Sequence, residues 1–191
     1  MTFRTTPAIS IAAVGFIAAS ASLYAAAPMI TFAASGTFAS TPTSGADTLK
    51  LAGEPFSVTI VVSASAVPYE HGSNWAAYNG LKLTGTVHSG LLGPTPVAIA
   101  SSEASIQQAI DPGQNDQFVT QAPVKVVGIN LTIKAIVIMP FGTIAQPLLH
   151  PFAPVSLGPG DATLSYSDGT STTVLTIQTG SLTGSIPTAE R

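Results

Sequence analysis

The stretch VKVVGINLTIKAIVIM, residues 124–139, decides which kind of fold this chain can adopt. Between Lys125 and Lys134 the residues alternate between an apolar set and a set of glycine, polar and charged residues. A period of two is typical of a β-strand with one buried face and one solvated face. Residues 135–139 are apolar on both faces, so we expect this end to run through the core or under a cover. Pro140 should end the strand, because proline has no N–H group to donate.

Other segments alternate in the same way and are predicted to be the partner strands of this stretch. They are separated by short groups of turn-forming residues, as in all-β domains. Asp168-Gly169 lies between two of them and is a strong signal for a β-hairpin, and Thr179-Gly180 predicts a further turn. The expected strands are 30–38, 49–51, 56–62, 81–88, 97–100, 162–167, 171–178 and 182–186.

One segment, SSEASIQQAI at 101–110, is predicted to form a short helix. A serine stands at its start, and Glu103 lies in the first turn, where the helix dipole favours a carboxylate. Asp111-Pro112-Gly113 should end it. The segment 141–159 is apolar but interrupted by four prolines, so we expect it to be extended and irregular.

Together these elements predict an all-β fold, namely an antiparallel β-sandwich in immunoglobulin-like or jelly-roll style with at most one short helix. The 191 residues are enough for one domain with a substantial core. An eight-stranded outer-membrane barrel would also show alternating strands, but it requires aromatic girdles at both membrane interfaces. Aromatic residues make up only 7% of this chain, which favours the sandwich.

The amino-acid composition excludes several classes of protein, binding partner and chemical site. Charged residues make up 8% of the chain, against roughly 25% in an average soluble domain. The 46% of hydrophobic residues excludes a disordered chain. A net charge of −3 without any Lys/Arg cluster argues against nucleic acid as a partner. Because the chain has no cysteine, disulfides, thiolate metal sites and a cysteine nucleophile are excluded.

The N-terminal segment 1–27 has the layout of a signal peptide, which would begin with a helix. Arg4 supplies the positive charge, an apolar run follows at 8–19, and small residues come next. Cleavage is expected after Ala21 or after Ala27, and an uncleaved anchor is the alternative. Residues 28–191 would then form the single mature domain, without a further membrane span. An uncharged surface rich in Ser, Thr and Ala suggests a bacterial protein exported to the periplasm, the cell surface or the medium.

The loop predicted at 68–80 concentrates the side chains that could bind a ligand. Aromatic rings can stack on the apolar face of a sugar, while amides and a carboxylate bond its hydroxyl groups. The alternative is that Trp75 and Tyr78 only fix a long loop to the domain. The candidate ligand-binding residues are Tyr69, Glu70, His71, Asn74, Trp75 and Tyr78.

No segment predicts a metal site, a cofactor or a catalytic residue. The spacing of His71, His88 and His150 matches no zinc pattern. The oxygen-rich segment 111–116 lacks the EF-hand spacing and is better explained as a turn. The nucleophile-elbow, phosphate-loop and dinucleotide-binding motifs are all missing, so we predict that the protein is not an enzyme.

Two functions remain after these exclusions. The first is an exported structural or surface-interaction module whose partner is a second copy or another surface protein. It would assemble by donating the strand 30–38 to a neighbouring sheet, since little charge protects the strand edges. The second is a secreted carbohydrate-binding module that uses the segment 68–80 to bind a polysaccharide.

Overall fold

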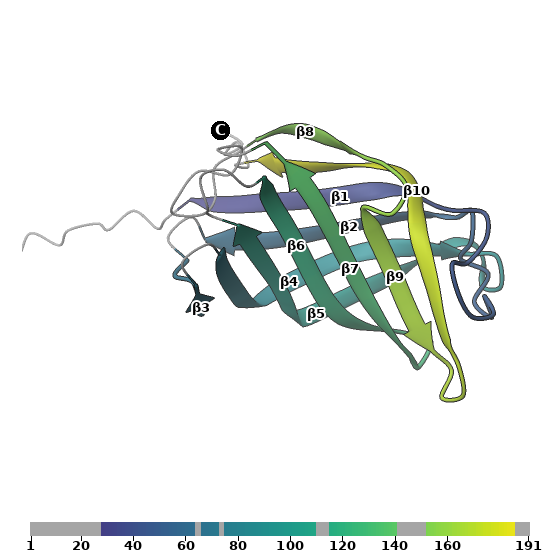
Figure 1. Ribbon diagram of the computed structural model, residues 1–191. Coiled ribbons are helices and arrows are strands. Elements are labelled where there is room, and N and C mark those ends of the chain that lie inside the picture. Colours follow the sequence, from purple (N-terminus) through teal and green to yellow (C-terminus); the bar gives the residue numbers. More distant parts are fainter. Residues whose placement is uncertain (1–27, 64–65, 73–74, 110–114, 141–151, 186–191) are drawn as a thin grey trace, which may run out of the picture.

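A computed structural model describes residues 28–63, 66–72, 75–109, 115–140 and 152–185 (Figure 1). These residues contain ten strands, and none of the described segments is helical. Consequently, no described segment is a helix of the length and apolarity needed to cross a membrane. The strands are β1 (Met29–Phe38), β2 (Pro55–Ser63), β3 (Glu70–His71), β4 (Trp75–Ser89), β5 (Gly93–Ala109), β6 (Asp116–Val126), β7 (Ile129–Met139), β8 (Phe152–Leu157), β9 (Ala162–Ser167) and β10 (Thr172–Ser185).

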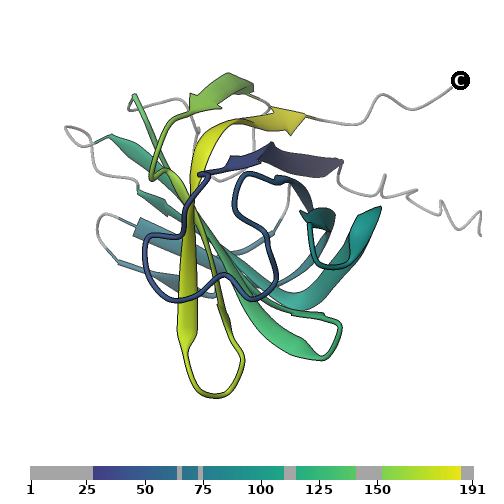
Figure 2. The same ribbon diagram turned by 90° about the vertical axis from the view of Figure 1, so that its right-hand side faces the viewer.

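Eight of these strands form a closed antiparallel barrel, so the predicted sandwich is wrong. Their order is β1-β2-β4-β5-β6-β7-β9-β10, and pairing between β1 and β10 closes the wall. Figure 2 shows the strands arranged around one ring. Alternating strands are expected for a sandwich and a barrel alike. The two folds differ in whether the first and last strands pair with each other. Hydrophobic periodicity shows which face of a strand is buried, but it does not show which strands pair.

The stretch 124–139 is a hairpin and not the single strand that its alternation suggested. β6 ends at Val126 and β7 begins at Ile129, and the two residues between them have positive φ angles, 50° for Val127 and 82° for Gly128. Positive φ at both central residues is characteristic of a type I′ hairpin turn. The buried positions are even-numbered in β6 and odd-numbered in β7, so the alternation shifts by one residue at the turn. β7 ends before Pro140, as predicted.

The predicted helix at 101–110 is also wrong, because residues up to Ala109 belong to β5. Ala104, Ile106 and Gln108 are buried in the barrel while the residues between them face outward. Pairing on both sides, with β4 and β6, outweighs the weak helix signals. The N–H of Glu103 does bond Ser101 Oγ at 3.1 Å, but it does so at an irregular position of the strand.

Apolar side chains fill the interior of the barrel. Phe32 lies at the centre of an aromatic group, with ring centroids 5.0 Å from Phe118 and 5.9 Å from Phe152. A cavity between the two sides of the barrel, lined by Ala34, Phe56, Ile133 and neighbouring residues, has a volume of only about 10 Å³, enough for at most one water molecule. Side chains therefore occupy the space in which larger barrels hold a ligand. The outward positions are mostly Ser, Thr, Ala, Gln and Lys.

Two glycines face each other where the barrel closes. Gly36 of β1 and Gly180 of β10 are paired in register. A Cβ atom on Gly36 would collide with the carbonyl oxygen of Thr179 and lie 2.9 Å from the Cα atom of Gly180. The missing side chains thus let the two strands approach closely. The predicted turn at 179–180 is wrong, because β10 continues through these residues to Ser185.

One end of the barrel is covered by the segment 39–54, which crosses the opening in Figure 2. Leu49 and Leu51, predicted to lie in a strand, instead bury their side chains as a plug. The carboxylate of Asp47 accepts bonds from the N–H of Leu51 at 3.1 Å and from the hydroxyl of Tyr166 at 2.8 Å. That hydroxyl also accepts a bond from the N–H of Leu49 at 3.1 Å.

Several predicted strands are confirmed, among them 30–38, 56–62 and the hairpin at Asp168-Gly169 that joins β9 to β10. The strand predicted at 97–100 is part of the much longer β5. Residues 135–139 were expected to lie in the core or under a cover. Among the described residues nothing covers the outer face of β7 at Ile138, whose side chain is 58% exposed. The predicted signal helix in 1–27, and residues 141–151 of the proline-rich segment, lie outside the described residues.

Candidate functional site

The segment 68–80, predicted as a loop, is largely a hairpin on the side of the barrel. β3 pairs with the start of β4, with Glu70 opposite Ala77 and His71 opposite Ala76. The N–H of Tyr69 bonds the carbonyl of Ala77 at 2.8 Å. β4 then continues into the barrel wall, where it pairs with β5. Glu70, His71, Trp75 and Tyr78 therefore stand on paired strands.

The structure separates the predicted ligand-binding residues. Glu70 is exposed and Trp75 is half-buried, and both face outward. Tyr78 faces the interior and is 4% exposed, so it belongs to the core. Tyr69 lies beside the hairpin and is 73% exposed. For His71 the structure gives the position of the backbone, which pairs with Ala76. Asn74 lies outside the described residues.

Glu70 and Trp75 meet polar residues of two further strands in a groove of about 250 Å³ on the outer wall. The floor is formed by small outward side chains, Ala77 of β4 and Ser105 of β5. Larger polar and aromatic side chains surround this floor. They are Glu70, Trp75, Asn79, Gln107 and Gln121.

The register of the strands sets the width of this groove. Ala77 pairs with Glu70 on one side and with Gln107 on the other. Because neighbouring strands are about 4.8 Å apart, the backbones at Glu70 and Gln107 are about 10 Å apart across the floor. In the next row, Ser105 pairs with Gln121. A carboxylate and two primary amides therefore face the same shallow space.

Trp75 is fixed against the hairpin by a neighbouring glycine. The N–H of Gly72 bonds the carbonyl of Trp75 at 2.8 Å. A Cβ atom on Gly72 would lie 2.8 Å from Cδ1 of the indole and closer still to Nε1. Only glycine allows the ring to take this position. The indole thus occupies the space that a side chain at residue 72 would need.

The groove presents groups that suit a polyhydroxylated ligand. Each amide of Asn79, Gln107 and Gln121 offers both hydrogen-bond donors and an acceptor, and the Glu70 carboxylate offers acceptors. The Trp75 indole adds an apolar ring face and one N–H donor. Within the part of the chain that the structure describes, no group of three His, Asp or Glu residues could hold a metal ion.

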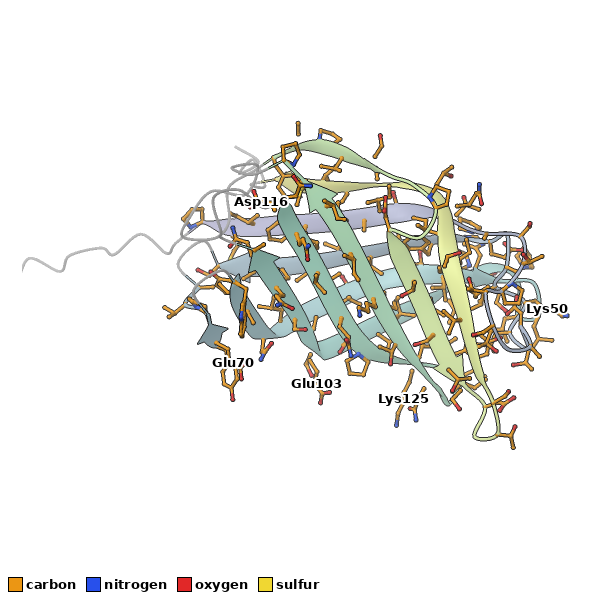
Figure 3. The ribbon with its side chains drawn as sticks, in the orientation of Figure 1. Lys50, Glu70, Glu103, Asp116 and Lys125 are labelled. Carbon is orange, nitrogen blue, oxygen red and sulfur yellow. The ribbon has the colours of Figure 1, made fainter. Side chains whose placement is uncertain are left out.

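A second depression continues the groove along the seam between β5 and β6. Here the two strands no longer pair, since their ladder covers only Ser105–Gln108 and Phe118–Gln121. The depression has a volume of about 590 Å³, and Glu103, Pro123 and Lys125 are among its lining residues. Figure 3 shows Glu70, Glu103 and Lys125 in succession along one side of the barrel, with their side chains directed outward.

The pairing of β4 with β5 is irregular close to this depression. The register shifts once between Tyr78 and Leu81 and again between Leu81 and Leu83, in opposite senses. Gly80 adopts a φ of 68°, as expected at a bulge. Bulges bend the strands that contain them, and the ladder between β5 and β6 ends at Ser105, next to these irregularities.

The three amides of the groove were not identified from the sequence. Asn79 lay in the predicted loop and Gln107 in the predicted helix, while Gln121 precedes the stretch 124–139. Their outward positions follow from the strand registers alone. The other polar residues considered earlier lie elsewhere: His88 faces outward further along β4, and Asp116 is buried.

Comparison of the chain with models of known protein families, with curated proteins and with solved structures finds no significant match. The function must therefore be inferred from the chemistry of the groove. Of the residues predicted from the sequence, Glu70 and Trp75 line it. Asn79, Gln107 and Gln121 complete it.

Proposed function

We propose that this protein is an exported, non-catalytic binding module whose ligand is a polysaccharide. The observation that supports this most directly is the groove that brings the Trp75 indole together with three amides and the Glu70 carboxylate. An aromatic face beside amide groups can bind a sugar ring on one side and its hydroxyls at the edges. Export is inferred from the segment 1–27 and from the low charge of the chain.

The position of the groove fits a binding role. Its residues stand on paired strands, which hold side chains more precisely than loops do. The interior of the barrel is filled, so the outer wall is the surface on which a ligand can be received. A polymer can lie along an outer wall, whereas it could not enter a closed barrel.

Fluorescence of the single tryptophan tests this proposal directly, because Trp75 lines the groove. We expect at least one polysaccharide in a panel of neutral and acidic glycans to change its emission in a saturable way. Gln107→Ala and Gln121→Ala should weaken that binding by about tenfold each, the effect of losing a hydrogen bond of about 1 kcal/mol or slightly more. Gln178→Ala is the matched control, since Gln178 is an exposed amide on β10. Unchanged emission across the whole panel would refute the proposal.

Assembly through sheet edges is the second candidate function. In the structure the strand 30–38, which was expected to be donated, is paired on both sides. β1 is paired with β2 on one side and with β10 on the other, so donating it would require opening the barrel. One observation favours assembly at another place: β8 pairs only with β10 among the described strands. An edge of this kind can accept a strand from a second copy.

Light scattering after size-exclusion chromatography tests this second candidate. Concentration-dependent assembly that disappears in Ala153→Lys would support it, because Ala153 is exposed on β8 and a lysine there blocks edge pairing. A monomer at every concentration would contradict it.

A further inference from the structure

The groove at Trp75 and the depression at Lys125 follow one another along a single seam of the barrel wall. Outward positions alternate along β6, so Val119 and Gln121 in the groove are followed by Pro123 and Lys125 in the depression. On β5 the corresponding neighbours are Ser105 and Glu103. The two spaces therefore lie next to each other along the wall, because adjacent outward residues of the same strands line them, and together we call them the furrow.

The length of this furrow follows from strand geometry. Val119 and Lys125 are six residues apart on β6, and a strand rises about 3.4 Å per residue, which gives about 20 Å. A single sugar ring covers only part of this distance. The depression alone, at about 590 Å³, is larger than the groove of about 250 Å³ that contains the tryptophan.

The chemistry of the furrow changes along its length. At the Trp75 end the lining combines an aromatic ring with amides. At the other end it combines Glu103, Lys125 and Asn130 with two serines and a part of β5 outside the β5–β6 ladder. The side chains of Glu103 and Lys125 are both exposed and directed outward. Such groups can bond hydroxyl or charged substituents of a second and third sugar unit.

We propose that the ligand is a linear polysaccharide bound along its chain, with successive sugar units in the groove and in the depression. The inference rests on the proposed polysaccharide-binding function and specifies the form of its ligand. Trp75 stacks on one unit, and Lys125 and Glu103 bond units further along. Affinity then depends on chain length, which would not be the case for a site that binds one terminal sugar.

Isothermal titration with oligosaccharides of increasing length tests this inference. The probes are cello-oligosaccharides, chito-oligosaccharides and oligogalacturonates, each from the disaccharide to the hexasaccharide. We expect affinity in the bound series to rise with length beyond the disaccharide. Lys125→Ala should weaken hexasaccharide binding by about tenfold, the loss of one bond to a charged group, and leave the disaccharide unchanged. Lys50→Ala is the control, because Lys50 is an exposed lysine of the segment 39–54 that lines neither the groove nor the depression.

The outcomes separate the two proposals. Equal affinity for disaccharide and hexasaccharide, with no effect of Lys125→Ala, would overturn the extended furrow and leave the polysaccharide-binding function standing. Binding that survives in Trp75→Ala but is lost in Lys125→Ala would overturn both. If neither the oligosaccharides nor the parent polysaccharides bind, the proposed function fails and the furrow proposal fails with it.

Discussion

Placing a methyl group at the closing seam should destabilise the barrel, and Gly36→Ala is the most direct way to do so. The added Cβ would meet the carbonyl oxygen of Thr179, lie 2.7 Å from Cδ1 of Ile177 and lie 2.9 Å from the Cα of Gly180. Two of these three atoms belong to the backbone of β10, which cannot move away without stretching the hydrogen bonds between β1 and β10. The substitution therefore acts on the contact that makes the sheet a barrel.

The expected magnitude combines two opposing effects. Overpacking costs about 1–3 kcal/mol, while replacing glycine by alanine gains about 0.4–1 kcal/mol by restricting the unfolded chain. We expect a net loss of about 1–2 kcal/mol in the free energy of unfolding. For a domain of this size, that corresponds to a lowering of the melting temperature by about 2–8 °C.

Urea unfolding of the wild type and two variants measures this loss. Gly158→Ala is the matched control, because its added Cβ would meet only Asp161 Oδ2 at 3.6 Å, an ordinary contact. It should be neutral or slightly stabilising, with an unchanged dependence on urea. If Gly36→Ala were as stable as Gly158→Ala, the close approach of β1 and β10 would be refuted.

Three further predictions concern other parts of the molecule. Tyr166→Phe should lower the free energy of unfolding by about 1–3 kcal/mol in urea titrations, because the half-buried carboxylate of Asp47 loses its hydroxyl partner; an unchanged midpoint would contradict this. Val127→Asn should stabilise the fold by about 1 kcal/mol, since asparagine tolerates the φ of 50° better than valine, and thermal unfolding checks it. The side-chain hydroxyl of Thr170 and nearby N–H groups lower the pKa of Asp168 from 3.8 to about 2. Its stabilising effect is thus complete above about pH 4 and is lost as the pH falls towards 2. NMR titration should find this pKa, and Thr170→Val should raise it.

How much of the fold the sequence predicts depends on how local the deciding interaction is. β1, β2 and the β9–β10 hairpin follow from alternation and from Asp168-Gly169, which act over a few residues. The turn at Val127-Gly128 was missed because valine rarely adopts a positive φ, although the shift in alternation marks it. Closure was missed because it depends on the pairing of Gly36 with Gly180, which no local pattern reports.

In the candidate site, too, some residues could be identified from a short segment of sequence and others could not. Trp75 and Glu70 stand out in the sequence because they are unusual residues in one short segment. Tyr78 was placed with them, but it lies three positions after Trp75 on the same strand, and an odd offset puts two strand residues on opposite faces. Gln107 and Gln121 join the site through strand register, which connects residues far apart in the chain.

The seam between β1 and β10 also determines when this protein can fold. β1 can complete its pairing only when β10 is present, since Thr31 pairs with Ser185 and Phe38 with Ile177. Contacts between such distant residues slow folding, because the loop entropy is lost before the pairing is gained. Until β10 leaves the ribosome the wall stays open, and the barrel remains an unfinished sheet with two free edges.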